Sequence, residues 1–212
     1  MDRGAQRDIA EVTLVVATIG LFLWFGRAAF PGVDLTFAGA VLALLAYSHW
    51  RAGEGWRELG FRWDTFWAAS RLLLPAVFVV GVLTWCASIV LSKLGSPPPG
   101  KLPRPSAVFV AFGIAQQYIL LGFIFKRIER VAGARLAPAL TAFLFALLHL
   151  PNIFLTAVTF VWGIVACRVY RRAPNLWANG LAHSLLSSLL WSMLPRSVTH
   201  ELRVGMEYVG LS

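Results

Sequence analysis

Acidic side chains are scarce in this sequence. The chain has 10 Asp and Glu against 19 Lys and Arg, and between Thr65 and His200 its only carboxylate is Glu129. Catalysis by glutamate or aspartate needs such a group as its base, and divalent metal ions are commonly held by anionic ligands. The second half of the chain therefore lacks what either kind of centre requires.

Cysteine is equally rare. Cys86 and Cys167 are the only two, and no CxxC spacing accompanies them, so the sequence indicates neither a disulfide framework nor a zinc site. Both lie in apolar runs, where we expect them to be small buried hydrophobic residues. We expect no metal ion and no cofactor.

Long hydrophobic runs dominate what is present. Hydrophobic residues make up 58% of the 212 positions and charged residues only 14%, with a mean hydropathy of +0.69. A membrane span needs roughly 20 apolar residues of helix, and only helices or closed barrels satisfy their backbone groups in lipid. The expected fold is an all-α polytopic membrane bundle of about seven transmembrane helices. The expected segments are 9–25, 33–47, 72–91, 108–125, 136–150, 154–169 and 176–194.

The net charge of +9 indicates topology rather than a nucleic-acid partner, because the basic residues lie mainly in short connections between apolar runs. With seven spans, the N-terminus and the second, fourth and sixth connections share the more basic side. We therefore expect a multi-pass protein of the inner cell membrane, with a cytoplasmic N-terminus and the tail from Arg196 to Ser212 outside. The expected partners are the lipid bilayer and another membrane protein or a peptide.

The chain divides at a connection rich in helix breakers. We expect membrane helices with an interfacial segment at 51–67 in residues 1–94, and a Pro/Gly linker at 95–105. A second helical core should occupy 106–194, followed by the tail 195–212. In the last helix, Gly180, Ser184 and Ser188 recur every four residues and predict close helix packing.

Four polar residues inside the predicted spans are candidates for a functional site. Gln116 and Gln117 lie at mid-span in IAQQYILLGFIFKR, His149 ends FALLH, and His183 lies in GLAHSLLSS. Polar groups at this depth must find partners, because lipid supplies none. We expect the two glutamines to face the bundle interior.

The order and spacing of these residues resemble the CAAX-protease and bacteriocin-processing family (CPBP, also called Abi), whose motifs are EExxxR, FxxxH and HxxxN. The resemblance covers roughly residues 58–191, including the string ELGFR at 58–62. The positions that match the three motifs in frame are Gln116, Gln117 and Leu121, Phe145 and His149, and His183 and Ser187.

The departures from the family pattern bear on activity. In the family a glutamate is taken to activate the attacking water, and a glutamine amide has no basic group that accepts this proton near neutral pH. Leu121 replaces the arginine that would balance two buried acids. The resemblance therefore implies a proteolytically inactive homologue, a pseudoenzyme that binds a partner through a neutral polar cleft.

Other interpretations remain open from the sequence. The chain could be an active CPBP-type intramembrane endopeptidase with unorthodox groups, or a purely structural subunit of a membrane complex. A Ser/His dyad of His183 and Ser187 is conceivable, as in a rhomboid protease, but serines at this helical spacing are usually packing residues. A metal site at His149 and His183 would lack an anionic ligand.

Overall fold

A computed structural model describes residues 3–26, 29–30, 32–96 and 107–210, and every regular element in these ranges is a helix. The first part has α1 (Arg3–Leu21), which continues as the π-helical η1 (Phe22–Gly26), then α3 (Asp34–Arg51) and α4 (Phe66–Lys93). The second has α5 (Ala107–Gln117), the π-helical η2 (Tyr118–Phe125), α6 (Lys126–Leu147), α7 (Ile153–Arg172) and α8 (Leu176–Met193). Three short elements follow: α9 (Arg196–Thr199), η3 (His200–Leu202) and α10 (Gly205–Val209). The all-α prediction is confirmed.

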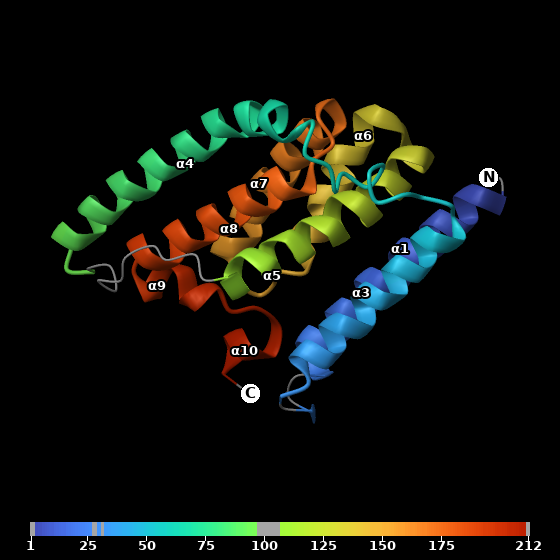
Figure 1. The fold of residues 1–212 in the computed structure, drawn as a ribbon. Coiled ribbons are helices and arrows are strands. Elements are labelled where there is room, and N and C mark those ends of the chain that lie inside the picture. The colour runs from blue at the N-terminus through green and yellow to red at the C-terminus, as the bar shows by residue number, and fades with distance from the viewer. Residues whose placement is uncertain (1–2, 27–28, 31, 97–106, 211–212) are drawn as a thin grey trace.

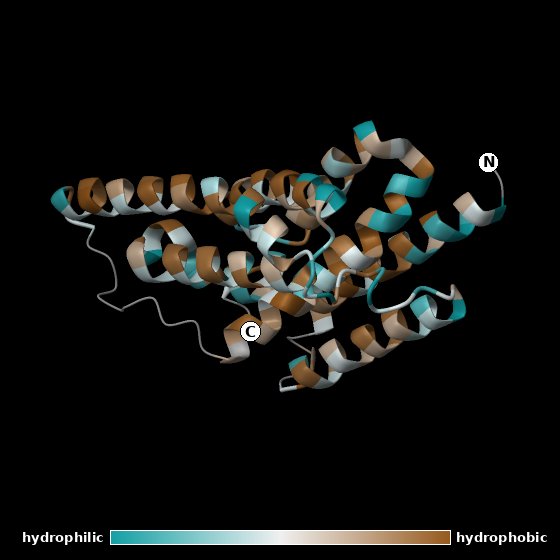
Figure 2. Cartoon of the chain, turned by 45° about the horizontal axis from the view of Figure 1, so that its top comes forward, coloured by the Kyte–Doolittle hydropathy of each residue, from teal (hydrophilic) through white to brown (hydrophobic). Residues whose placement is uncertain are grey.

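Four helical stretches in the described ranges are long and apolar enough to cross a membrane. They are Arg3–Gly26, Phe66–Lys93, Phe109–Leu147 and Ile153–Arg172. Figure 2 shows hydrophobic residues running along the long helices and hydrophilic residues mainly in the connections and near the N-terminus. The exposed apolar side chains on these helices suit contact with lipid, among them Leu14, Phe78 and Leu83, which are 58%, 72% and 63% exposed.

The fourth and fifth predicted segments fall within one helical run that reverses at Gly133. This residue has φ 74° and ψ 166°, a conformation that a glycine adopts without steric cost. Beyond it α6 packs along α7, where a Cβ on Gly163 would come within 2.9 Å of Ala142. The turn at Gly133 therefore makes two neighbouring helices from a run of 39 residues.

Helix α8 lies at the centre of the bundle, packed against α4 and α5 (Figure 1). A Cβ on Gly180 would come within 2.7 Å of the Ile114 backbone, and one on Gly113 within 3.0 Å of the Gly180 carbonyl. Ser184 and Ser188 are buried on the same face. The predicted small-residue packing is thus internal to the chain, and this face is not free to receive a partner helix.

The connection 52–65 is fixed to the turn between α7 and α8. The Tyr170 hydroxyl donates to the Leu59 carbonyl at 2.8 Å, and the Leu176 amide donates to the Gly60 carbonyl at 2.8 Å. Gly60 has φ +90°, and a Cβ there would come within 2.9 Å of the Tyr170 ring. The ELGFR string therefore holds one end of the bundle together.

At the other end the chain after α8 folds back on the turn between α6 and α7. The Asn152 amide donates to the Thr199 carbonyl at 3.0 Å, and the Gly205 amide donates to the Leu150 carbonyl at 2.8 Å.

Most of the predicted linker 95–105 lies outside the described residues. Cys167 is buried as expected, but Cys86 is exposed on α4, so the prediction of a buried residue was wrong there. Its helix is covered by neighbours along one side only.

Candidate functional site

Gln117 ends α5 at the centre of the candidate site. Its side chain is fully buried, and its Nε2 lies 3.3 Å from Nδ1 of His183 on α8. The π-helix η2 begins at the next residue, and π-helical turns inside α-helices occur frequently at functional sites. The glutamine and the histidine thus meet between two helices that glycine allows to pack closely.

His149 approaches the same place from the turn after α6. Its ring packs edge-on against the Phe145 ring at 4.7 Å between centroids, and the His183 ring lies 6.1 Å from that same phenylalanine. Both histidines are 8% exposed. Phe145 therefore lies beside both imidazoles. We call Gln117, Phe145, His149 and His183 the polar cluster.

Hydrogen bonding fixes the tautomer of each histidine. The Nδ1 of His149 lies 2.7 Å from the Phe145 carbonyl oxygen, which only accepts, so Nδ1–H donates. Burial disfavours a charged imidazolium, and in the neutral ring Nε2 is left as an acceptor. The Gln117 amide nitrogen only donates, so Nδ1 of His183 accepts and its proton lies on Nε2. Both rings are neutral in this arrangement, and their Nε2 atoms have opposite hydrogen-bonding roles.

Two further polar atoms remain buried near the cluster without a hydrogen-bond partner in the described part of the chain. They are Oε1 of Gln117 and Nε1 of Trp162, whose ring lies 6.3 Å from that of His183. Trp162 was not singled out from the sequence, because a tryptophan in an apolar helix gives no local signal of its neighbours. The cluster therefore contains unused donors and acceptors at a depth where lipid offers none.

The remaining motif positions, Gln116, Leu121 and Ser187, do not belong to the polar cluster. Leu121 is fully buried in η2, while Gln116 and Ser187 are only half-buried. Among the residues that the structure describes, no hydrogen bond joins Ser187 to His183, although they are one turn apart. Within the same ranges no group of three or more His, Cys, Asp or Glu is arranged to hold a metal ion.

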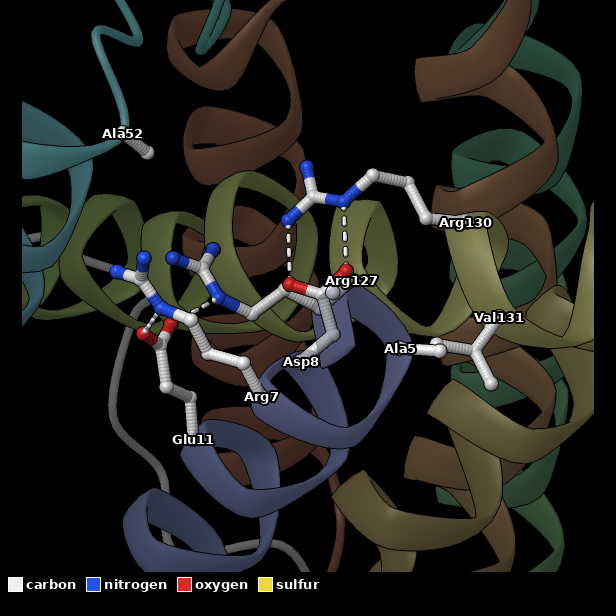
Figure 3. A pocket seen from close by; sticks show the side chains of 9 residues that line it. Ala5, Arg7, Asp8, Glu11, Ala52, Arg127, Arg130 and Val131 are labelled. Atoms are coloured by element: carbon white, nitrogen blue, oxygen red, sulfur yellow. Dashed lines mark hydrogen bonds and ion pairs between the residues drawn. The ribbon is translucent and has the colours of Figure 1, made fainter. Parts of the chain in front are cut away.

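Three carboxylates of the first part of the chain, those of Asp8, Glu11 and Glu54, gather instead around Arg127 and Arg130, about ten residues after Gln117 (Figure 3). Arg127 is 1% exposed, and its Nε donates to Glu11 at 2.8 Å and its Nη2 to Ser48 at 2.9 Å. We call this group the ion-pair network; its other members are Arg7, Asp8, His49, Glu54, Lys126 and Arg130.

The network favours the ionised form of Glu54. Glu54 bridges His49 at 2.5 Å, Lys126 at 3.2 Å and Arg130 at 3.1 Å. Partial burial opposes its ionisation, but the hydrogen bond with His49 and the charge of Lys126 outweigh this and keep the pKa of Glu54 well below its usual range. Glu11 and Arg127 are 116 residues apart in the sequence, so no local pattern indicated their contact.

Residues 98–189 match the family model described as type II CAAX prenyl endopeptidase Rce1-like. This stretch of the chain is Rce1-like. The match contains Gln117, Phe145, His149 and His183, so the resemblance drawn from the motifs is confirmed. Neither the curated proteins nor the solved structures gave a match. Residues 98–189 are thus similar to the Rce1-like CAAX prenyl endopeptidases, and four helical stretches of the described residues are long and apolar enough to cross a membrane.

Proposed function

We propose that this Rce1-like chain does not hydrolyse peptide bonds and instead holds a peptide, or a segment of another membrane protein, at the polar cluster. The observation that carries the proposal is the neutral side chain of Gln117, which stands where the family pattern has a glutamate and is hydrogen-bonded to His183. A glutamine cannot serve as the general base, which typically contributes 10²- to 10⁴-fold to the rate.

The remaining hydrogen-bonding groups suit a peptide backbone. His149 Nε2 and Gln117 Oε1 are acceptors, whereas His183 Nε2–H and Trp162 Nε1–H are donors. A peptide group presents one N–H donor and one C=O acceptor. A bound segment whose helical hydrogen bonds are interrupted has free backbone N–H and C=O groups. These groups could form hydrogen bonds with the side chains of the polar cluster. Both the segment and the cluster would gain, because a buried polar group without a hydrogen-bond partner costs free energy.

The test is quantitative co-purification of partner proteins from native membranes in mild detergent. The double variant Gln117→Leu with His183→Leu should lose most of the bound partner while staying folded and inserted. A matched control is Thr159→Val with Ser192→Ala, which removes two buried hydroxyls bonded only within their own helices. Full retention of the partner by the first variant would contradict the proposal and favour the purely structural subunit.

The competing function is an active endopeptidase in which a histidine replaces the glutamate. The acceptor Nε2 of His149 is the one observation that favours it. Turnover of a peptide that survives Ser187→Ala and disappears in His149→Ala would establish that function. We expect no such turnover, because no carboxylate of the described residues is hydrogen-bonded to the cluster to support the imidazole.

A further inference from the structure

A second polar site lies apart from the cluster, between the first turns of α1 and the start of α6. It is an open pocket of about 360 Å³. The guanidiniums of Arg7, Arg127 and Arg130 line it together with the carboxylates of Asp8 and Glu11, as Figure 3 shows. Its lining residues come from the first turns of α1, from Ala52 directly after α3 and from the start of α6. Charges of both signs therefore face one opening.

The donors of this pocket outnumber its acceptors. Three guanidiniums face two carboxylates in the lining. Behind it Glu54 pairs with Arg130 at 3.1 Å and with Lys126 at 3.2 Å, so four cationic Arg and Lys side chains meet three carboxylates in all. Glu11 accepts from both Arg7 and Arg127, and Asp8 accepts twice from Arg130. Arg127 also donates to Ser48 and Arg130 to Glu54, but each guanidinium has five N–H groups, so these acceptors do not satisfy all of them. Two arginines sharing one carboxylate would be further stabilised by a second anion between them.

An apolar track begins below the pocket on the exposed side of α1. Leu14 and Leu21 follow Arg7 at intervals of seven residues, which places them on one face of the helix. They are 58% and 61% exposed, and Phe25 in η1 extends the track with 64% exposed. A cationic pocket above a continuous apolar face is matched by a molecule with an anionic head and hydrocarbon chains.

We propose that this pocket binds the phosphate of an anionic phospholipid, with its acyl chains along the exposed face of α1. The basic connections place the pocket on the side expected to face the cytoplasm, where basic pockets between membrane helices bind anionic headgroups. Inorganic phosphate has the same head but no chains. Only a phospholipid would contact the apolar track through its acyl chains, so binding that depends on these chains distinguishes a phospholipid from inorganic phosphate.

The experiment measures binding to the full purified chain in detergent, by the rise of its melting temperature with added ligand. The ligands are phosphatidylglycerol, phosphatidylcholine and inorganic phosphate. We expect a saturable rise with phosphatidylglycerol only, and Arg7→Gln should weaken its affinity about fivefold. The matched control is Arg57→Gln, which also removes an exposed arginine paired with a carboxylate at 2.8 Å but lies outside the pocket.

A second variant keeps every charge and fills the space instead. Val131 lines the pocket and is 36% exposed, so Val131→Trp should fold normally and lose the effect of phosphatidylglycerol. Equal losses of phosphatidylglycerol affinity in Arg7→Gln and Arg57→Gln would overturn the proposal, because they would show that the lipid is attracted to surface charge in general. An equal rise with inorganic phosphate would also overturn it, in favour of a site for a free anion.

Discussion

The substitution Glu11→Gln probes the contact that joins the first helix to the Rce1-like region. Glutamine keeps the size of the side chain and one acceptor oxygen but removes the negative charge. Arg127, which is 1% exposed, would then keep its positive charge without the carboxylate at 2.8 Å. Removing one partner of a buried ion pair costs about 3–5 kcal/mol in other proteins.

The cost here should be smaller than that range. Glu11 is 22% exposed, and Arg127 retains Ser48 at 2.9 Å and Glu54 at 3.9 Å. We therefore expect the free energy of unfolding to fall by about 2–3 kcal/mol. At about 2–4 °C per kcal/mol for a chain of this size, the melting temperature should drop by about 4–12 °C.

Intrinsic fluorescence of the nine tryptophans in detergent provides the assay. The control is Asp64→Asn, because Asp64 also accepts from two arginines, Arg57 and Arg62, but in an exposed position. It should change the melting temperature little. Adding Arg127→Met to Glu11→Gln should recover much of the loss, since no buried charge then remains. Equal melting temperatures for Glu11→Gln and Asp64→Asn would refute the reasoning.

Three further predictions follow from the topology, the pH response and the site. A reporter fused after Ser212 should report the outside and one after Arg130 the cytoplasm; a cytoplasmic C-terminus would mean that the number of spans is wrong. The folded-state pKa of Glu54 is lowered, so its stabilising contribution is present above its unfolded value of about 4.3 and is lost as pH falls below it. The melting temperature should therefore fall on acidification below that pH, and less steeply in Glu54→Gln; parallel curves would contradict this. Gln116→Glu with Gln117→Glu should produce no peptide hydrolysis, because two adjacent acids, one of them fully buried, favour protonation when no arginine faces them; measurable turnover in a peptide assay would contradict it.

The fold was largely predictable because the membrane limits the choice of structure. Apolar runs of sufficient length have to form helices there, and the predicted segments correspond to helices in the structure. The boundary between the fourth and fifth segments was also correctly placed, although its cause is local. Gly133 permits the reversal of the backbone. In the hydropathy pattern this place is visible only as a short polar interval between two apolar runs.

The site was predictable only in part. Spacing indicated that Gln116 and Gln117 belong to the same motif, but neighbouring helical residues point about 100° apart, so one of them is fully buried and the other is not. The contact of Glu11 with Arg127 joins residues 116 positions apart. No local pattern encodes such a pair, because it depends on how α1 docks on the reversed helix.

The most direct test of the central claim is a hydrolysis measurement on the purified chain in liposomes. CAAX peptides, with and without a prenyl group, would be incubated with the wild type and with His149→Ala, and the products quantified by mass spectrometry. The proposed function predicts no product above background from either protein. Product that forms with the wild type and vanishes in His149→Ala would contradict it and make the chain a histidine-dependent protease.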